Sequence, residues 1–169
     1  MPDFIKSYVR FVDTFNRRVG LFAMYLIFAM FAILFYSSIS KAFHLPANWT
    51  LESAQFTMAA YYMLGGAFAM QTGDHVRMDL FYSQWSLRRR AAFDVVTAVA
   101  LIVFLGFMLY GGISSTAYAI QFNEKSFSAW APYMAPIKTI MTFGVVMMLA
   151  QATSSLFKDI AELRGRPIA

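Results

Sequence analysis

The residues best suited to chemistry lie together in one short segment, Gly73-Asp74-His75-Val76-Arg77-Met78-Asp79. A histidine between two carboxylates can act as a general base that an acidic neighbour orients, and an arginine can bind an anion. The segment holds no serine, threonine or cysteine that such a base could activate as a nucleophile. We therefore expect no catalytic site here, and we predict a salt-bridged turn built from Asp74, His75, Arg77 and Asp79.

The composition indicates that lipid surrounds most of the chain. Of the 169 residues, 59% are hydrophobic and only 14% are charged, whereas a soluble domain is nearer to half apolar and a quarter charged. The absence of cysteine excludes disulfides, thiolate metal sites and cysteine nucleophiles. The net charge of +5 does not indicate nucleic-acid binding, because the basic residues lie in separate clusters between apolar runs.

Four apolar segments are long enough to cross about 30 Å of hydrocarbon as helices. We predict an all-α integral membrane protein with four transmembrane helices plus an N-terminal amphipathic interfacial helix. All of them belong to a single membrane domain over 1–169. The expected ranges are 4–18 for the amphipathic helix and 19–40, 52–71, 91–121 and 136–157 for the transmembrane helices.

The expected N-terminal helix has two chemically different sides at about 100° per residue. One side is apolar and the other is mostly basic, which is typical of a helix that lies in the headgroup region of a membrane. The apolar run that follows is too long for a signal peptide, so we expect an uncleaved first span. The apolar side holds Phe4, Tyr8, Phe11, Val12 and Phe15, and the polar side holds Lys6, Arg10, Asp13 and Arg17.

The second expected span begins with polar residues and ends with small ones. Thr50 or Asn48 is expected to cap it, and Glu52 falls in the first turn, where a carboxylate complements the exposed N–H groups. Trp49 suits the aromatic belt at a membrane surface. Gly65, Ala69 and Gly73 recur every four residues, a spacing that lets another helix approach closely.

Positive charge is unequally divided between the two sides that four spans define. The side with both termini and the 73–90 segment carries eleven of the fourteen basic residues, including every arginine, whereas the opposite side carries Lys41, Lys125 and Lys138. Because lysine and arginine accumulate in cytoplasmic loops, we expect both termini to be cytoplasmic.

The interiors of the expected spans lack Asp, Glu, Lys, Arg and His. Ion and substrate pathways usually retain such residues, and a haem-binding anchor needs histidine ligands within its spans. We therefore expect no cofactor, no metal and no pathway through this chain alone. We expect its intramembrane polar side chains to bond between helices. These are Ser37, Ser38, Thr57, Ser114, Ser115, Thr116, Gln121, Thr142, Gln151 and Thr153.

A set of motifs around the second span resembles one transporter family. Trp49-x-x-Glu52 precedes Gly65-Gly66-Ala67, and Asp74-His75-Val76-x-x-Asp79 follows the span. Together with the four-span plan, this set resembles the small membrane subunit (the DctQ-like or Q subunit) of tripartite ATP-independent periplasmic (TRAP) transporters over nearly the whole chain. Some members carry a second acidic residue where this chain has Leu51, so no carboxylate pair is implied. The signature and structural residues are Trp49, Glu52, Gly65, Ala69, Gly73, Asp74, His75, Arg77 and Asp79.

The resemblance implies a role in transport and no enzyme activity. In this family a periplasmic binding protein delivers the solute to a membrane pair, and the small subunit supports a large, elevator-type subunit. The implied process is ion-gradient-driven uptake of an organic anion, commonly a carboxylate, across a bacterial inner membrane. The implied partners are the large membrane subunit, the binding protein and membrane lipids. A self-sufficient four-span oligomeric transporter or channel, or a membrane anchor of a respiratory enzyme, remains the competing hypothesis. Residues expected to contact the binding protein are His44, Asn48, Glu124, Lys125 and Trp130.

Overall fold

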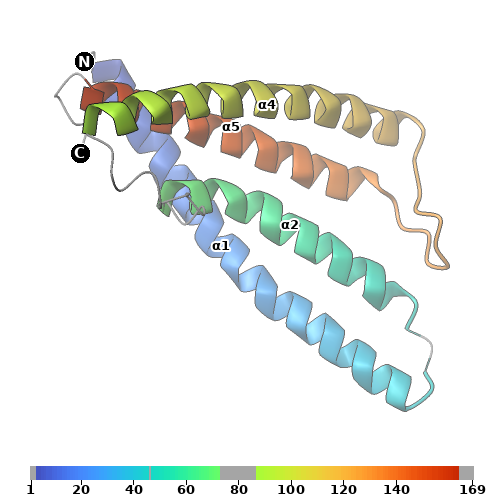
Figure 1. The fold of residues 1–169 in the computed structure, drawn as a ribbon. Coiled ribbons are helices and arrows are strands. Elements are labelled where there is room, and N and C mark those ends of the chain that lie inside the picture. Colours follow the sequence, from blue (N-terminus) through green and yellow to red (C-terminus); the bar gives the residue numbers. More distant parts are fainter. Residues whose placement is uncertain (1–2, 46, 73–86, 164–169) are drawn as a thin grey trace.

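The computed structural model describes residues 3–45, 47–72 and 87–163 as four helices and their connections. The helices are α1 (Asp3–Ala42), α2 (Trp49–Thr72), α4 (Leu87–Gln121) and α5 (Ala135–Leu163). They run alternately up and down, and they converge at the end of the bundle that carries both termini (Figure 1). We call this the terminal end. The opposite end, where residues 43–48 and 122–134 connect the helices, is the loop end. The all-α class is confirmed.

The first helix corrects the prediction of a separate interfacial helix. α1 runs without interruption through the expected boundary between residues 18 and 19. No proline interrupts the stretch, and Gly20 alone weakens a helix by only about 1 kcal/mol. A break would also leave backbone N–H and C=O groups without partners near lipid. At about 1.5 Å per residue, α1 is about 60 Å long, so it exceeds the hydrocarbon thickness.

Two helices end on residues in the left-handed conformation, although neither residue is glycine. His44 has φ 56°, and Leu45 N–H donates to the Ser40 carbonyl at 2.9 Å after the end of α1. Asn123 has φ 47°, and Glu124 N–H donates to the Ala119 carbonyl at 3.1 Å after α4. These bonds satisfy carbonyls that a helix end leaves exposed. Both chain reversals are therefore fixed by local hydrogen bonds.

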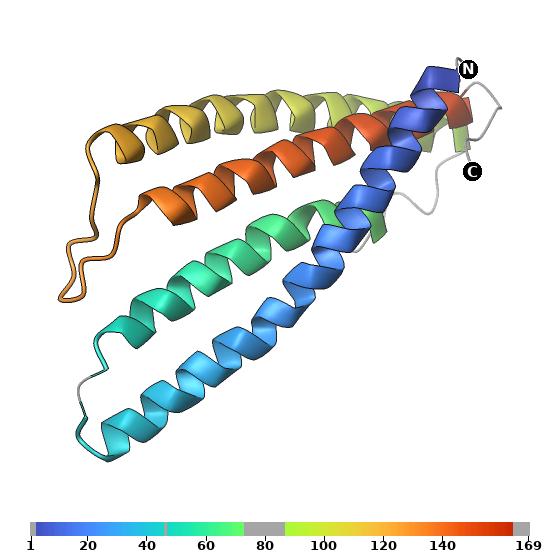
Figure 2. The ribbon, with the colours of Figure 1, turned by 180° about the vertical axis from the view of Figure 1, so that it is seen from behind.

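The packing places α5 at the centre of the bundle. α5 contacts α1, α2 and α4, and α1 and α2 form a second extensive contact. The view from behind shows α1 crossing α5 near the terminal end and running beside α2 toward the loop end (Figure 2). One buried cluster joins α1, α2 and α5 through Ala23, Leu64, Ala67 and Met147, and the other joins α4 and α5 through Leu105, Val145 and Ala152.

Three of the four helices have the length and apolarity of a membrane span. These are α1, α4 and α5, and most large apolar side chains of α1 and α4 are exposed, as expected for surfaces that face lipid. α2 is long enough to cross but is diluted by Gln55, Tyr61 and Tyr62 and by two glycines. The structure thus supports a multi-pass membrane protein with three candidate spans in its described part.

Candidate functional site: polar contacts at the two ends of the bundle

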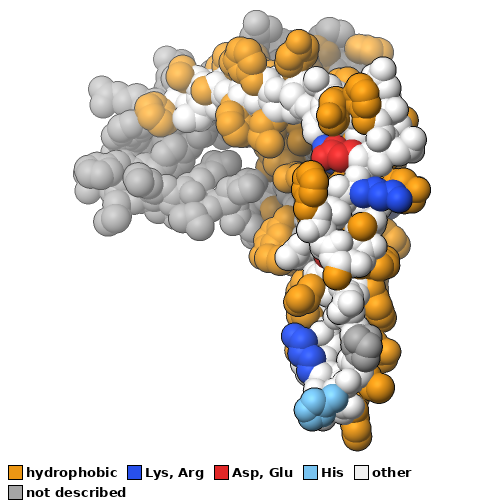
Figure 3. All heavy atoms as spheres, turned by 90° about the vertical axis from the view of Figure 1, so that its right-hand side faces the viewer, with side chains coloured by type: hydrophobic (Ala, Val, Ile, Leu, Met, Phe, Trp, Pro, Cys, Tyr) orange, Lys and Arg blue, Asp and Glu red, His pale blue; other side chains and the backbone are white. Residues whose placement is uncertain are grey.

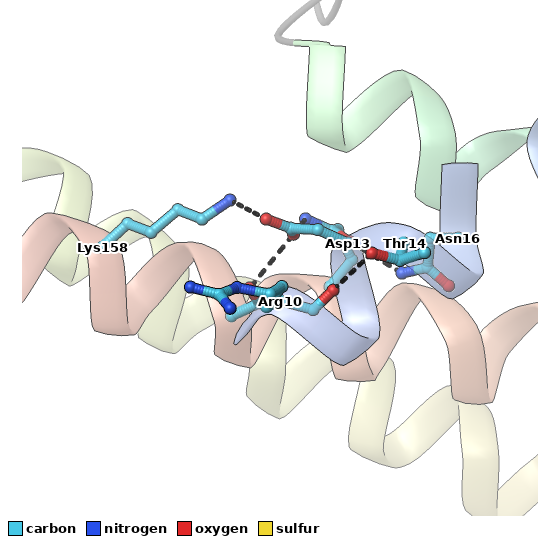
Figure 4. Close-up of polar contacts among 7 residues, drawn as sticks. Arg10, Asp13, Thr14, Asn16 and Lys158 are labelled. Carbon is cyan, nitrogen blue, oxygen red and sulfur yellow. Dashed lines mark hydrogen bonds and ion pairs between the residues drawn. The ribbon is translucent and has the colours of Figure 1, made fainter. Parts of the chain in front are cut away.

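The terminal end is held by a polar network centred on Asp13 of α1 (Figure 4). One carboxylate oxygen, Oδ2, accepts a hydrogen bond from Lys158 Nζ at 2.6 Å and forms an ion pair with it. The other, Oδ1, accepts from Gln151 Nε2 at 3.1 Å and Ser154 Oγ at 3.3 Å. All three donors belong to α5, so Asp13 fastens the start of α1 to the last turns of α5.

The network continues into the interior through two side-chain amides. Asn16 Nδ2 donates to Gln151 Oε1 at 2.7 Å, and Gln151 and Ser154 are both 0% exposed. About two turns earlier on α1, Tyr8 Oη lies 2.8 Å from Thr153 Oγ1, and its ring meets Phe157 edge-on. Buried polar groups that are bonded in this way specify one alignment of two helices, because a shift in register would leave them unpaired.

The sequence placed Asp13 on a solvated side of the first helix, and the structure corrects that assignment. Val9, Val12 and Asn16 form the buried face toward α5, whereas Phe4 and Phe11 are 82% and 70% exposed. A helical periodicity shows which residues share a side but not which side meets another helix. A usable signal existed in α5, where Gln151, Ser154 and Lys158 follow one face of an otherwise apolar helix.

The prediction that polar side chains within the spans would bond between helices is confirmed for several of them. Gln151 and Thr153 bond to α1, and Thr116 Oγ1 lies 2.9 Å from Thr142 Oγ1 across α4 and α5. Ser37 of α1 contacts Thr50 of α2 at 3.0 Å. By contrast, Ser38 and Thr57 donate to carbonyls of their own helices.

Glu52 connects α2 to the loop end. It lies in the first turn of α2, as predicted, and it is only 8% exposed. Its Oε1 accepts a hydrogen bond from Ser126 Oγ at 2.7 Å, whereas its Oε2 is buried with no hydrogen-bond partner among the described residues. Glu52 therefore ties α2 to the connection between α4 and α5 in addition to occupying a helix start. No sequence pattern indicated the contact with Ser126.

The other residues at the start of α2 make structural contacts. Thr50 is the second residue of α2 and therefore not its N-cap, and its hydroxyl donates to the Ala47 carbonyl at 2.8 Å. The Trp49 ring packs on Tyr36 of α1 with the ring centroids 5.6 Å apart. Both contacts fix the angle at which α2 leaves the preceding loop.

The connection between α4 and α5 folds back on itself as a short hairpin over 124–134. Ser126 N–H donates to the Pro132 carbonyl and Met134 N–H donates to the Glu124 carbonyl, both at 2.9 Å. The ammonium group of Lys125 lies 4.9 Å from the centroid of the Tyr133 ring. Glu124 forms an ion pair with Lys138 in the first turn of α5. The hairpin is thus anchored to α5, and through Glu52 to α2.

The five residues expected to contact a binding protein lie at the loop end. His44, Asn48, Lys125 and Trp130 are exposed, whereas Glu124 is half-buried in its ion pair. Phe127, which the sequence did not single out, is fully exposed in the hairpin. A view onto this side shows acidic atoms beside basic ones, and other basic and histidine side chains separated from them by apolar and neutral atoms (Figure 3). The loop end therefore offers scattered polar groups and exposed aromatic rings, and no concentrated charge.

Close helix approaches occur at glycines other than the predicted ones. A Cβ added to Gly144 of α5 would lie 2.7 Å from the Met63 carbonyl oxygen, and one added to Gly20 of α1 would lie 2.3 Å from Phe68 Cβ. Gly65, in contrast, has nothing within 4 Å of an added Cβ. The stripe of small residues on α2 thus faces outward at Gly65. Gly73, Asp74, His75, Arg77 and Asp79 lie outside the described residues.

This arrangement is suited to holding helices together. Over the described residues, no group of three or more His, Cys, Asp or Glu side chains could hold a metal ion. The polar groups named above bond to one another at the ends of the bundle, and the uncharged centres of the helices form the apolar core. The class is therefore a multi-span membrane protein whose polar residues serve its own architecture.

Comparison with known families identifies this class further. Residues 30–162 match the family model described as "Tripartite ATP-independent periplasmic transporters, DctQ component". The chain belongs to this family; it is a transport component and not an enzyme. Membership implies that it works with the other components of a tripartite transporter. A search of curated proteins found no matching relative.

Proposed function

We propose that this chain is the small membrane subunit that scaffolds a large, elevator-type subunit during uptake of an organic anion. The observation that carries the proposal is the family match over most of the chain. The bundle supports it, because polar side chains within the spans join helices to one another. The solute, a carboxylate delivered by a periplasmic binding protein, would cross through the large subunit under an ion gradient.

In this proposal α2 is the fourth transmembrane helix of a single membrane domain. At about 1.5 Å per residue, its 24 residues extend about 36 Å, enough to cross the hydrocarbon. The excess of arginine at the terminal end supports cytoplasmic termini in a bacterial inner membrane. The loop end would then face the periplasm and the binding protein.

The outer face of α2 is the surface that we assign to the large subunit. It follows one stripe of the helix, and its polar and small members give poorer contact with lipid than the phenylalanines of α4. A partner helix can approach closely at Gly65, where no described residue lies within 4 Å of an added Cβ. The stripe consists of Leu51, Gln55, Met58, Tyr62, Gly65, Ala69 and Thr72.

Two matched glycine variants test this interface. Gly65→Leu should reduce the yield of the large subunit that co-purifies with a tagged chain, because the added side chain blocks the close approach. Gly106→Leu is the control, since Gly106 of α4 also has nothing within 4 Å of an added Cβ. If the two variants co-purify equal amounts of the large subunit, α2 is not the interface.

The wider proposal is tested by reconstitution into liposomes with an imposed ion gradient. Uptake of a carboxylate should require this chain, the large subunit and the binding protein together. Uptake by this chain alone would contradict the proposal and favour a self-sufficient transporter. Binding-protein docking should weaken when Phe127 or Trp130 is replaced by alanine. If both variants dock the binding protein unchanged, the hairpin is not part of the docking surface.

A further inference from the structure

Two neighbouring arginines of α1 lie where its long uncharged segment begins. Arg17 and Arg18 are exposed, and no charged residue follows them in α1 until Lys41. Since α1 continues through this point as one helix, both guanidinium groups lie at the start of its uncharged run, where a spanning helix meets the headgroups. Their depth in the membrane is therefore fixed by the helix itself.

The carboxylate expected to neutralise this pair is engaged elsewhere. Asp13 precedes Arg17 by four residues, the spacing at which an acidic and a basic side chain pair on one helix. Both oxygens of Asp13, however, accept hydrogen bonds from α5, one of them within the ion pair to Lys158. Within the described part of the chain, neither Arg17 nor Arg18 forms an ion pair. An anion from outside the described part of the chain would balance them.

The surroundings of Arg18 indicate the class of this anion. At about 100° per residue, Arg18 shares one outward stripe of α1 with Phe15 and Phe22, which are 41% and 62% exposed. A ligand at this stripe meets cationic groups at one level and aromatic rings toward the hydrocarbon. We propose that Arg17 and Arg18 bind the phosphate group of an anionic phospholipid whose acyl chains pack along α1.

A phospholipid fits both parts of this surface, because its phosphate can meet the arginines and its acyl chains can meet the phenylalanine rings. Arginine donates two parallel hydrogen bonds to a phosphate, and the adjoining aromatic rings remove apolar acyl surface from contact with polar headgroups. A free phosphate ion would use only the arginines. The inference does not depend on which leaflet holds the terminal end or on the assignment of the large subunit.

A titration with defined lipids tests the site. The full-length chain, in neutral detergent with any subunit that co-purifies, is titrated with dioleoylphosphatidylglycerol while its thermal unfolding midpoint is followed. Each arginine replaced by glutamine should raise the half-saturating lipid fraction about fivefold, and Arg17→Gln with Arg18→Gln should raise it roughly twenty-five-fold. Arg10→Gln is the matched control, because Arg10 is exposed on α1 about 10 Å farther from the uncharged segment. It should change the titration less than twofold.

Each alternative has a distinct outcome. Equal effects of Arg10→Gln and Arg18→Gln would indicate diffuse surface charge and overturn the site. If inorganic phosphate raises the unfolding midpoint as much as the lipid does, the arginines bind a free anion and the lipid proposal is wrong. If dioleoylphosphatidylcholine raises the unfolding midpoint as much as dioleoylphosphatidylglycerol does, the site does not require a net negative charge on the lipid, which contradicts the proposal. An unchanged titration after loss of both arginines would refute the proposal, with helical circular dichroism verifying that the variants are folded.

Discussion

The terminal end and the loop end are both fastened by a carboxylate, yet the two carboxylates have different surroundings. Asp13 accepts three hydrogen bonds and pairs with Lys158, so both of its oxygens are satisfied within the chain. Glu52 accepts one bond from Ser126, and its second oxygen has no partner among the described residues. The Asp13 carboxylate is thus fully bonded by described residues, whereas the Glu52 carboxylate is held by a single neutral donor.

This difference fits different tasks at the two ends. A fully bonded network fixes the alignment of α1 on α5, because each lost partner would leave a buried polar group unsatisfied. At the loop end the helices spread apart, and a hairpin connects them (Figures 1 and 2). We expect this end to adapt more readily to another protein. The following predictions test that contrast.

The largest effect is expected at the terminal end. Asp13→Ala removes the acceptor for Gln151, Ser154 and Lys158, and it should lower the free energy of unfolding by about 2–3 kcal/mol. Asp13→Asn keeps an oxygen acceptor, so it should lower the free energy of unfolding by about half as much as Asp13→Ala. Thermal unfolding of the purified chain in detergent measures both. A loss below about 0.5 kcal/mol for Asp13→Ala would show that the network does not fix this end.

A smaller effect is expected between the ends, at the contact of α2 with α5. Gly144→Ala forces an added Cβ against the Met63 carbonyl oxygen, and the displaced backbone should lower stability by about 1–2 kcal/mol. Gly111→Ala is the control, because nothing lies within 4 Å of its added Cβ. The same unfolding assay compares the two. Equal stabilities would mean that the helices are not in close contact at Gly144.

The loop end should respond less than either of these sites. Glu52→Ala removes one hydrogen bond and should lower the free energy of unfolding by about 1 kcal/mol. Ser126→Ala removes the donor of that bond, leaves the carboxylate unpaired, and should lower it by a similar amount. Protease cleavage within residues 124–134 should also accelerate in both variants. A loss at Glu52 as large as that at Asp13 would abolish the contrast between the ends.

The smallest effect is expected for the coupling between the two ends. Asp13 and Ser37, which contacts the start of α2, are separated by about 36 Å along α1. A double-mutant cycle of Asp13→Ala and Glu52→Ala should therefore give a coupling energy below about 0.5 kcal/mol. A larger value would indicate that the ends form one cooperative unit.

The sequence predicted the helices better than it predicted their contacts. α2 lies within a few residues of its expected range, because charged and proline-containing stretches bracket a long apolar run. α5 continues past its expected end to Leu163, since Lys158 and Asp159 remain helical and Lys158 bonds to Asp13 of α1. The error at α1 arose because a change from an amphipathic to a wholly apolar pattern does not require a change in backbone conformation.

Site residues were predictable where their role is local. The position of Glu52 in the first turn of α2 followed from the sequence, whereas its bond to Ser126 joins residues 74 positions apart. The same reason explains why Gly65 was favoured over Gly144. Spacing reveals which residues share a face, but only the packing of α2 against α5 shows which face is occupied.

By itself the sequence determined that this chain is a helical membrane protein, that its apolar runs form the helices, and that the centres of these helices lack charge. Those properties follow from the exclusion of unpaired polar groups from lipid, which acts on each segment separately. The tertiary structure alone decided that Asp13 turns toward α5, that Glu52 meets the hairpin, and that Arg17 and Arg18 have no partner in the described chain. Such choices depend on which helix faces meet, and no single segment contains that information.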